Sequence, residues 1–185
     1  MRAAERAWER VTKGVLTQKD FRKVDGFLKN EFVKPGKTCH IIGSRNLYHR
    51  TFFGRYISRL EALMRTYPPT ACIGSNGTQT GTLLSQLQKF TNFIETDHTA
   101  WDLHVSEQLL AALNDEYRRI FSVPTQDAPY FEFVLDAYLE SDWTYRNGIS
   151  YTLRGTRVSG DVDTTAGNSL IHVALNRVVA RLSGL

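Results

Sequence analysis

Cysteine is scarce in this chain of 185 residues, which contains only Cys39 and Cys72. Their spacing matches no metal site and they provide no disulfide framework, so a reducing compartment is expected. No apolar run approaches the roughly 18 residues that a membrane span requires, and the charged N-terminal stretch has no signal-peptide core. The sequence also shows no internal repeat and no low-complexity tract. A chain of 185 residues fits one globular domain or two subdomains and is long enough to bury a sizeable core.

Positive charge is concentrated in the first third of the chain. The formal net charge is +4 and the isoelectric point is about 9.1. Between Lys13 and Arg65 the sequence has twelve Lys and Arg but only four Asp and Glu. This balance favours an anionic partner. From charge alone, a solvated basic face explains it equally simply and is the more common case.

Hydrophobic periodicity predicts a mixture of helices and strands. A 3.6-residue period or a helix-like composition predicts six helices, which cover residues 2–13, 48–67, 80–90, 104–121, 127–143 and 166–182. Residues 27–46 read as extended with a Pro-Gly turn, 70–81 as a loop and 92–98 as a short strand. Asn147-Gly148 lies between alternating apolar residues, the strongest short-range signal for a β-hairpin. Because these segments follow no regular βαβ rhythm, the predicted fold class is α+β.

Two stretches carry residues suited to chemistry. Asp97 ends the predicted strand and Asp102 precedes a helix, so a carboxylate there could hold a hard cation such as Mg²⁺. The simpler alternative is that Asp97 or Thr99 caps the following helix. The loop VSGDVDTTAGN, residues 158–168, is rich in small hydroxyl and amide side chains immediately before the last helix. Such a loop is typical of close backbone approach, of a helix start, or of both.

The order of these motifs resembles the RNA-directed RNA polymerases of positive-strand RNA viruses, most closely the tombusvirus-like and nodavirus-like branches. Asp97 and Asp102 match the first palm motif, an Asp, four residues and a second Asp. The segments FVKPGKTCHIIGSRN and FFGRYISRLE are similar to the fingers motif that contacts the incoming triphosphate and to the stretch that follows it. The resemblance covers roughly residues 28 to 180. The second palm motif is the most specific match and comprises Ser159, Gly160, Asp161, Thr164, Gly167 and Asn168.

Two features depart from the family pattern. His40 stands where many relatives have an arginine, and a neutral imidazole binds phosphate less strongly than a guanidinium. No Gly-Asp-Asp triplet occurs in the sequence, so the second metal-binding carboxylate pair of the family is missing. We therefore expect the fingers and the first half of the palm of a right-hand polymerase, with helical and extended elements packed on a small antiparallel sheet. Residues 1–92 would be the fingers-like region and 93–185 the partial palm.

The resemblance also implies roles for individual residues. Asp97 would be the catalytic metal ligand, for Mg²⁺ or Mn²⁺. The triphosphate would be neutralised by three cations, Lys34, Lys37 and Arg45. Asp102 and Asn168 would recognise the ribose 2′-hydroxyl, which distinguishes RNA from DNA, and Ser159, Gly160, Asp161 and Thr164 would support them. Without the family match, a helix-capping role would be preferred for the cluster around Asn168.

These roles make a geometric prediction. Asp102 and Asn168 should point into one cleft, within about 2.7–3.2 Å or one bridging water of each other, and Asp97 should open onto that cleft. The capping alternative instead turns each side chain back onto its own helix end.

The implied partners are an RNA template and primer, nucleoside triphosphates and a second chain completing the palm, in the host cytoplasm or at replication membranes reached through other proteins. A non-catalytic RNA-binding module is the second hypothesis. A reverse-transcriptase relative is a third, which the Ser-Gly-Asp, Thr and Gly-Asn pattern argues against.

Overall fold

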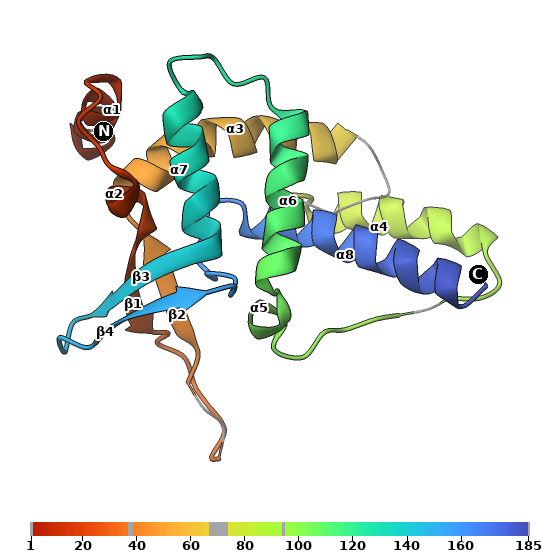
Figure 1. Ribbon diagram of the computed structural model, residues 1–185. Coiled ribbons are helices and arrows are strands. Elements are labelled where there is room, and N and C mark those ends of the chain that lie inside the picture. Colours follow the sequence, from red (N-terminus) through yellow and green to blue (C-terminus); the bar gives the residue numbers. More distant parts are fainter. Residues whose placement is uncertain (1, 37–38, 67–73, 94, 185) are drawn as a thin grey trace.

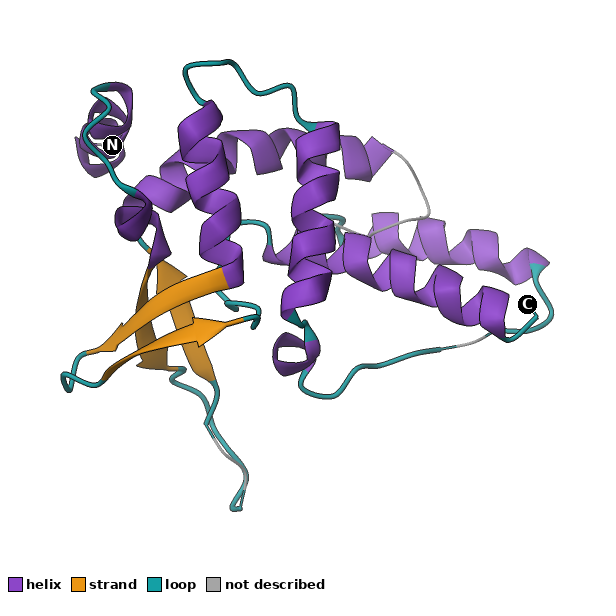
Figure 2. Ribbon diagram, viewed as in Figure 1, coloured by secondary structure: helices purple, strands orange, loops and turns teal. Residues whose placement is uncertain are grey.

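The computed structural model describes residues 2–36, 39–66, 74–93 and 95–184. Helices and strands alternate along the chain without a repeating unit, in the order α1 (Arg2–Thr12), α2 (Gln18–Arg22), β1 (Lys23–Leu28), β2 (Ile41–Arg45), α3 (Leu47–Thr66), α4 (Gly77–Ser85), the 3₁₀ helix η1 (Gln86–Lys89), α5 (Trp101–His104), α6 (Glu107–Ile120), α7 (Ala128–Leu139), β3 (Glu140–Tyr145), β4 (Ser150–Arg154) and α8 (Thr164–Leu182). The strands gather at one end of the molecule and most helices lie above or beside them (Figure 2). The α+β class is therefore confirmed.

The four strands form one mixed sheet in the order β2-β1-β3-β4 (Figure 1). The pairs β1–β2 and β3–β4 are antiparallel, but β1 and β3 are parallel. The expectation of an antiparallel sheet is wrong at this central pair. The chain leaves β2 through several helices and returns in β3 alongside β1, and such a crossover connection is what parallel pairing requires. The sheet takes two strands from residues 1–92 and two from 93–185, so the two predicted regions share it.

The main core lies among α3, α6 and α7 and is dominated by aromatic rings. Phe53 is fully buried, and its ring centroid lies 5.5, 5.9 and 5.8 Å from those of Tyr117, Phe131 and Tyr138. Phe21 from α2 joins the same cluster through Phe52. Edge-to-face pairs of this kind add to the stabilisation that burial provides. This core fixes the helices against the sheet end and thereby positions the loop that precedes α8.

Most predicted elements are confirmed, but one predicted strand and two predicted boundaries are wrong. Residues 92, 93 and 95–98 form no strand in the described part of the chain. Gly77 to Gly81, predicted as loop, begin α4, because Asn76 and Gln79 form a reciprocal capping box there. The helix predicted over 127–143 ends at Leu139 and continues as β3, where burial alternates along the strand. The helix over 48–67 and the Asn-Gly hairpin are confirmed.

No described helix has both the length and the apolar character needed to cross a bilayer.

Candidate functional site

The loop before α8 is held against the edge strand β2. Gly160 forms a parallel bridge with Ser44, and a Cβ atom at Gly160 would lie 1.9 Å from the carbonyl oxygen of Gly43. Real Cβ atoms do not come this close, so only glycine fits here. The Thr164 hydroxyl donates to the carbonyl oxygens of Ser159 and Asp161, at 3.3 and 2.7 Å, and closes the loop on itself. Gly160 therefore allows the loop to approach β2 closely, and the Thr164 hydroxyl holds the loop closed.

Beneath this loop lie two buried ion pairs. The Arg45 Nε atom donates to Asp161 Oδ1 at 2.7 Å, and Arg157 Nη2 lies 2.8 Å from Asp163 Oδ1. All four side chains are almost completely buried. Both guanidinium groups also lie over the ring of Tyr138, at 5.7 and 5.4 Å from its centroid, which adds a cation–π attraction. The two pairs tie β2 and the loop to α7.

Burial and neighbouring charge shift the ionisation of these groups. Burial is the largest cause that raises the pKa of Asp161, and the nearby Arg45 and Arg157 oppose it. Burial likewise raises the pKa of Tyr117 well above its usual value, so the phenol stays protonated and donates to Asp163 Oδ2 at 2.5 Å. A Cβ at Gly167 would come within 2.9 Å of Arg157, Asp163 and Tyr117, so glycine at this position leaves room for the network.

These observations correct part of the expected site. Arg45 and Asp161 face the interior and each other, because a buried charge is stabilised by a hydrogen-bonded partner. The Arg45 guanidinium is thus not on the surface where a triphosphate would bind. The close approaches that require Gly160 and Gly167 are to other parts of this chain. Glycine is therefore required at these two positions by contacts within the chain, and the predicted contact with nucleic acid is not needed to explain it.

The basic segment before β2 is exposed. Lys34 lies in the long connection between β1 and β2, which extends below the sheet in Figure 1. Lys37 lies outside the described residues. The His40 ring is also exposed and pairs with Glu31. Lys34 is therefore free to reach an external anion, in contrast to Arg45.

Asp102 reaches the loop from the short helix α5. Its Oδ2 atom accepts a hydrogen bond from the Ser159 hydroxyl at 2.7 Å. The two residues line a cleft of about 740 Å³ between α5 and the sheet. The residue before α5 is Ala100, in a left-handed conformation with φ 51°, and it makes no side-chain cap. Helix capping by Asp97 or Thr99 is therefore not what the structure shows.

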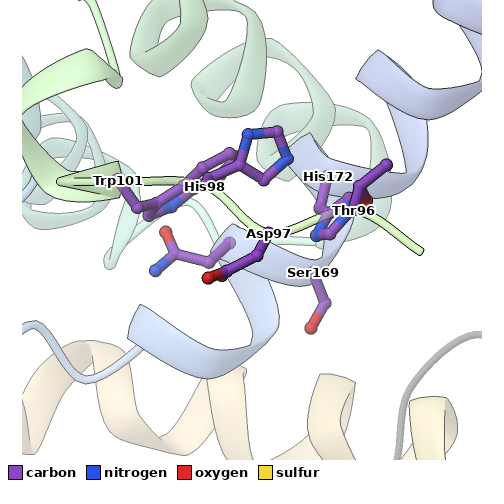
Figure 3. A pocket seen from close by; sticks show the side chains of 7 residues that line it. Thr96, Asp97, His98, Trp101, Ser169 and His172 are labelled. Carbon is purple, nitrogen blue, oxygen red and sulfur yellow. The ribbon is translucent and has the colours of Figure 1, made fainter.

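Asp97 and Asn168 share a second cavity, of about 260 Å³, lined also by Thr96, His98, Trp101, Ser169 and His172. The labelled side chains of this cavity come from two segments, the stretch that runs into the first residue of α5 and the first half of α8 (Figure 3). The Asn168 Oδ1 atom is buried and has no hydrogen-bond partner among the described residues. An unpaired buried acceptor is costly unless a ligand or water satisfies it, so this atom is available to accept a hydrogen bond from either.

The two cavities are neighbours, because Trp101 lines both. The structure thus brings Asp97 and Asn168 to one cavity but places Asp102 with Ser159 in the adjoining cleft. The prediction that Asp102 and Asn168 point into one common cleft is therefore wrong, because the Asp102 carboxylate is held by the Ser159 hydroxyl. Asn168 lies one turn inside α8 and caps nothing, since the cap residue of this helix is Asp163.

Sequence reasoning missed the aromatic wall of the smaller cavity. His98 and His172 meet edge to face at 4.9 Å, and His98 lies 4.7 Å from the Trp101 ring. Asn168 and His172 are four residues apart on α8, so the helical period could have placed both on one face. No comparable pattern in the sequence signals that Arg157 pairs with Asp163.

The residues present fit a divalent cation only in part. Within the described residues no cluster of three His, Cys, Asp or Glu side chains could hold a metal by itself. Asp161 and Asp163 are committed to arginines, which leaves Asp97 as the carboxylate open to the smaller cavity. One carboxylate together with substrate phosphates is a common way of binding Mg²⁺.

Comparison with known proteins identifies the family of this chain. A family model described as viral RNA-dependent RNA polymerase matches residues 4–184. The chain belongs to the viral RNA-dependent RNA polymerase family. It is 29% identical over 184 residues to an RNA-directed RNA polymerase of groundnut rosette virus (strain MC1), covering 88% of this chain and 20% of that protein. It is 30% identical over 158 residues to an RNA-directed RNA polymerase of pothos latent virus (isolate Pigeonpea/India), covering 79% and 21%.

The polymerase resemblance predicted from the motifs is therefore confirmed for the family. The chain spans about one fifth of the length of these two viral polymerases.

Proposed function

We propose that this chain forms part of an RNA-directed RNA polymerase and binds the incoming nucleoside triphosphate. In the reaction a 3′-hydroxyl of RNA attacks the α-phosphate, the new phosphodiester bond forms and pyrophosphate leaves. The observation that carries the proposal is the shared cavity of Asp97 and Asn168, with its unsatisfied amide oxygen. In the right-hand description, residues 1–92 are fingers-like and 93–185 are a partial palm.

Each polar side chain has a distinct task in this proposal. Asp97 holds Mg²⁺ or Mn²⁺, and the ion, when bound, neutralises phosphate charge and lowers the pKa of the attacking hydroxyl. The Asn168 carbonyl oxygen accepts a hydrogen bond from the ribose 2′-hydroxyl. Asp102, held by Ser159, approaches the same nucleotide from the adjoining cleft. Lys34 and Lys37 meet phosphates, and Arg45 acts indirectly by holding the loop.

The proposed partners are RNA and nucleoside triphosphates, with a further polypeptide segment or second chain supplying the Gly-Asp-Asp carboxylates. We propose the host cytoplasm as the place of action, including replication membranes reached through other proteins. The main competing function is a non-catalytic RNA-binding module. It predicts RNA binding without selective binding of a nucleotide.

The direct test is discrimination between ATP and 2′-deoxy-ATP by the purified chain in the presence of Mn²⁺. We expect the ribonucleotide to bind about 5- to 100-fold more tightly, because the deoxy analogue leaves a buried acceptor unpaired. Asn168→Ala should remove the preference, and Gln126→Ala, an exposed amide in the α6–α7 connection, should keep it. Equal binding of both nucleotides by the wild-type chain would refute the proposed site, and RNA binding without nucleotide binding would favour the non-catalytic module.

A further inference from the structure

The two faces of the sheet differ in chemistry. The register places Trp143 of β3 opposite Val24 of β1 and Tyr151 of β4, so these side chains share a face. By alternation Tyr145 lies on the same face. The acidic residues of the four described strands, Asp25, Glu140 and Asp142, all lie on the opposite face. The face that carries Trp143, Tyr145 and Tyr151, here called the aromatic face, is therefore free of strand carboxylates.

Trp143 lies nearly parallel to both tyrosine rings of the aromatic face, while the two tyrosine rings are tilted by 35° to each other. Trp143 and Tyr151 are stacked at 6.2 Å with 13° between their planes, and Trp143 and Tyr145 at 6.3 Å with 22°. The hydroxyl groups of Tyr145 and Tyr151 are 2.7 Å apart and hydrogen-bonded. Aromatic side chains that pair across strands stabilise a hairpin. This stabilisation does not explain why Tyr151 stays exposed to solvent.

Two glycines keep these rings flat on the sheet. A Cβ at Gly43 would lie 2.4 Å from the Trp143 ring, and a Cβ at Gly26 would lie 2.6 Å from the Tyr145 ring. The rings therefore occupy the space above neighbouring strands where other side chains would stand. Trp143 is only 6% exposed and supports the layer, whereas Tyr151 is 38% exposed. The result is a flat aromatic surface at the solvent boundary.

This surface forms one wall of the larger cleft. Trp143 and Tyr151 line it from the sheet side, and Asp102 and Leu103 line it from α5. Lys29 and His40 lie on its rim, where both pair with Glu31. The exposed Arg146 follows Tyr145 in the hairpin turn. A flat aromatic wall with cations around it suits a ligand that carries both bases and phosphates.

We propose that the aromatic face binds unpaired bases of single-stranded RNA. A base stacks on Tyr151, Tyr145 and Trp143 hold that ring in place, and Lys29 and Arg146 meet the flanking phosphates. Every base has a π-face, so stacking of this kind tolerates any sequence. The proposal rests on the proposed function only in taking RNA as the partner; none of these residues belongs to the polymerase motifs of the sequence.

The test measures binding of a fluorescein-labelled, unstructured 12-nucleotide RNA by anisotropy at several salt concentrations. Tyr151→Ala should weaken binding by roughly 5- to 100-fold at every salt concentration, the range found when one stacking aromatic is removed. The dependence on salt should keep its slope, because no phosphate contact is lost. Tyr151→Phe keeps the ring and should bind within about 3-fold of wild type. Phe90→Ala removes another exposed aromatic, which follows the 3₁₀ helix η1 and belongs to none of the four strands, and should change nothing.

Three outcomes would overturn the proposal. Tyr151→Ala could bind RNA like wild type, an RNA with abasic positions could bind as tightly as the normal one, or Tyr151→Phe could lose as much affinity as Tyr151→Ala. Loss of self-association in Tyr151→Ala, with RNA binding unchanged, would identify the face as a protein contact instead. Failure here leaves the ATP preference governed by Asn168 intact, so it is distinguishable from failure of the proposed nucleotide site.

Discussion

The Arg45 Nε atom and the Asp161 Oδ1 atom are 2.7 Å apart in the interior of the protein, and their side chains are 0% and 1% exposed. Arg45 ends β2, and Asp161 lies 116 residues later in the loop before α8. One ion pair therefore joins β2 to the loop that precedes α8. Because neither group can reach water, loss of one partner leaves the other uncompensated.

We predict that Asp161→Ala destabilises the fold by about 3–5 kcal/mol, the usual cost of leaving a buried charge unpaired. The double variant Arg45→Met/Asp161→Leu should recover most of that loss, since apolar side chains of similar size need no partner. Urea denaturation measures both values. Arg50→Ala removes an exposed arginine of α3 and should stay within about 0.5 kcal/mol of wild type. A stable Asp161→Ala variant would show that the pair contributes little.

Gly160→Ala should also be strongly destabilising. Its Cβ would overlap the Gly43 carbonyl oxygen, so the loop would have to leave β2. We expect a loss of about 1–3 kcal/mol, typical of forced overpacking. Gly81→Ala is the matched control, because a Cβ there meets nothing within 4 Å inside α4. Alanine in a helix interior should raise stability by about 0.5–1 kcal/mol, so the two substitutions should shift the melting temperature in opposite directions.

Stability should depend on pH through His49. Burial, reinforced by the neighbouring Arg45 and Arg157, holds the pKa of this imidazole well below its usual value of 6.5. Below pH 6.5 the unfolded chain therefore binds a proton that the folded chain does not, and stability falls as pH falls, by up to about 1.4 kcal/mol per pH unit. Above pH 6.5 this contribution is constant.

His49→Phe should flatten that slope in urea titrations between pH 5 and 8, because the ring packing against Phe53 and Tyr138 remains. His104→Gln, at an exposed position of α5 with no ion pair among the described residues, is the control and should leave the slope unchanged. An unchanged slope in His49→Phe would assign the pH dependence to other groups.

RNA binding should weaken with salt, and part of that dependence should come from Lys34. Single-stranded RNA loses about 0.7 in the slope of log K against log[salt] for each phosphate contact removed. Lys34→Ala should therefore flatten the slope by about this amount, while Lys19→Ala on α2 should not. Identical slopes for Lys34→Ala and wild type would mean that the basic connection is only solvated.

We predict that the 185-residue chain alone adds no nucleotide to a primed RNA template, because its sequence has no Gly-Asp-Asp. A second polypeptide that carries this motif should restore addition if the two halves assemble. Incorporation of labelled nucleotide on a primed template measures both cases, with Asp97→Ala as the inactive control. Addition by the chain alone that disappears in Asp97→Ala would contradict the assignment of a partial palm.

Local sequence signals predicted the elements better than their pairing. The apolar period over residues 48–67 predicted α3, because the pattern depends only on residues three or four positions apart in the same helix. The predicted strand at 92–98 rested on composition alone, and no described partner strand is there to accept its hydrogen bonds. The parallel pairing of β1 with β3 depends on a crossover of about a hundred residues, which no local pattern encodes.

The candidate site was predictable where a motif reported chemistry directly. Asp97 and Asn168 lie at one cavity, but Asp102, which was expected to share it with Asn168, lines the adjoining cleft. Arg45 was misplaced because charge counts do not tell which arginine is buried. Side chains alternate between the two faces along β2, so Arg45 shares a face with Gly43. Trp143 covers that face at Gly43, so Arg45 lies on the buried face of β2. The pairing of Arg45 with Asp161 itself is a tertiary contact that the sequence does not express.

The parallel pairing of β1 with β3 affects how the protein folds during its synthesis on the ribosome. Lys23 pairs with Asp142, so 119 residues of synthesis separate the two partners. At about 5–20 residues per second, β1 waits roughly 6–24 s for β3 to be made. During that time β1 can pair only with β2 and exposes its other edge, a template for pairing with a neighbouring nascent chain. Chains made close together on one messenger RNA are therefore most at risk of pairing wrongly with each other before residue 145 has emerged.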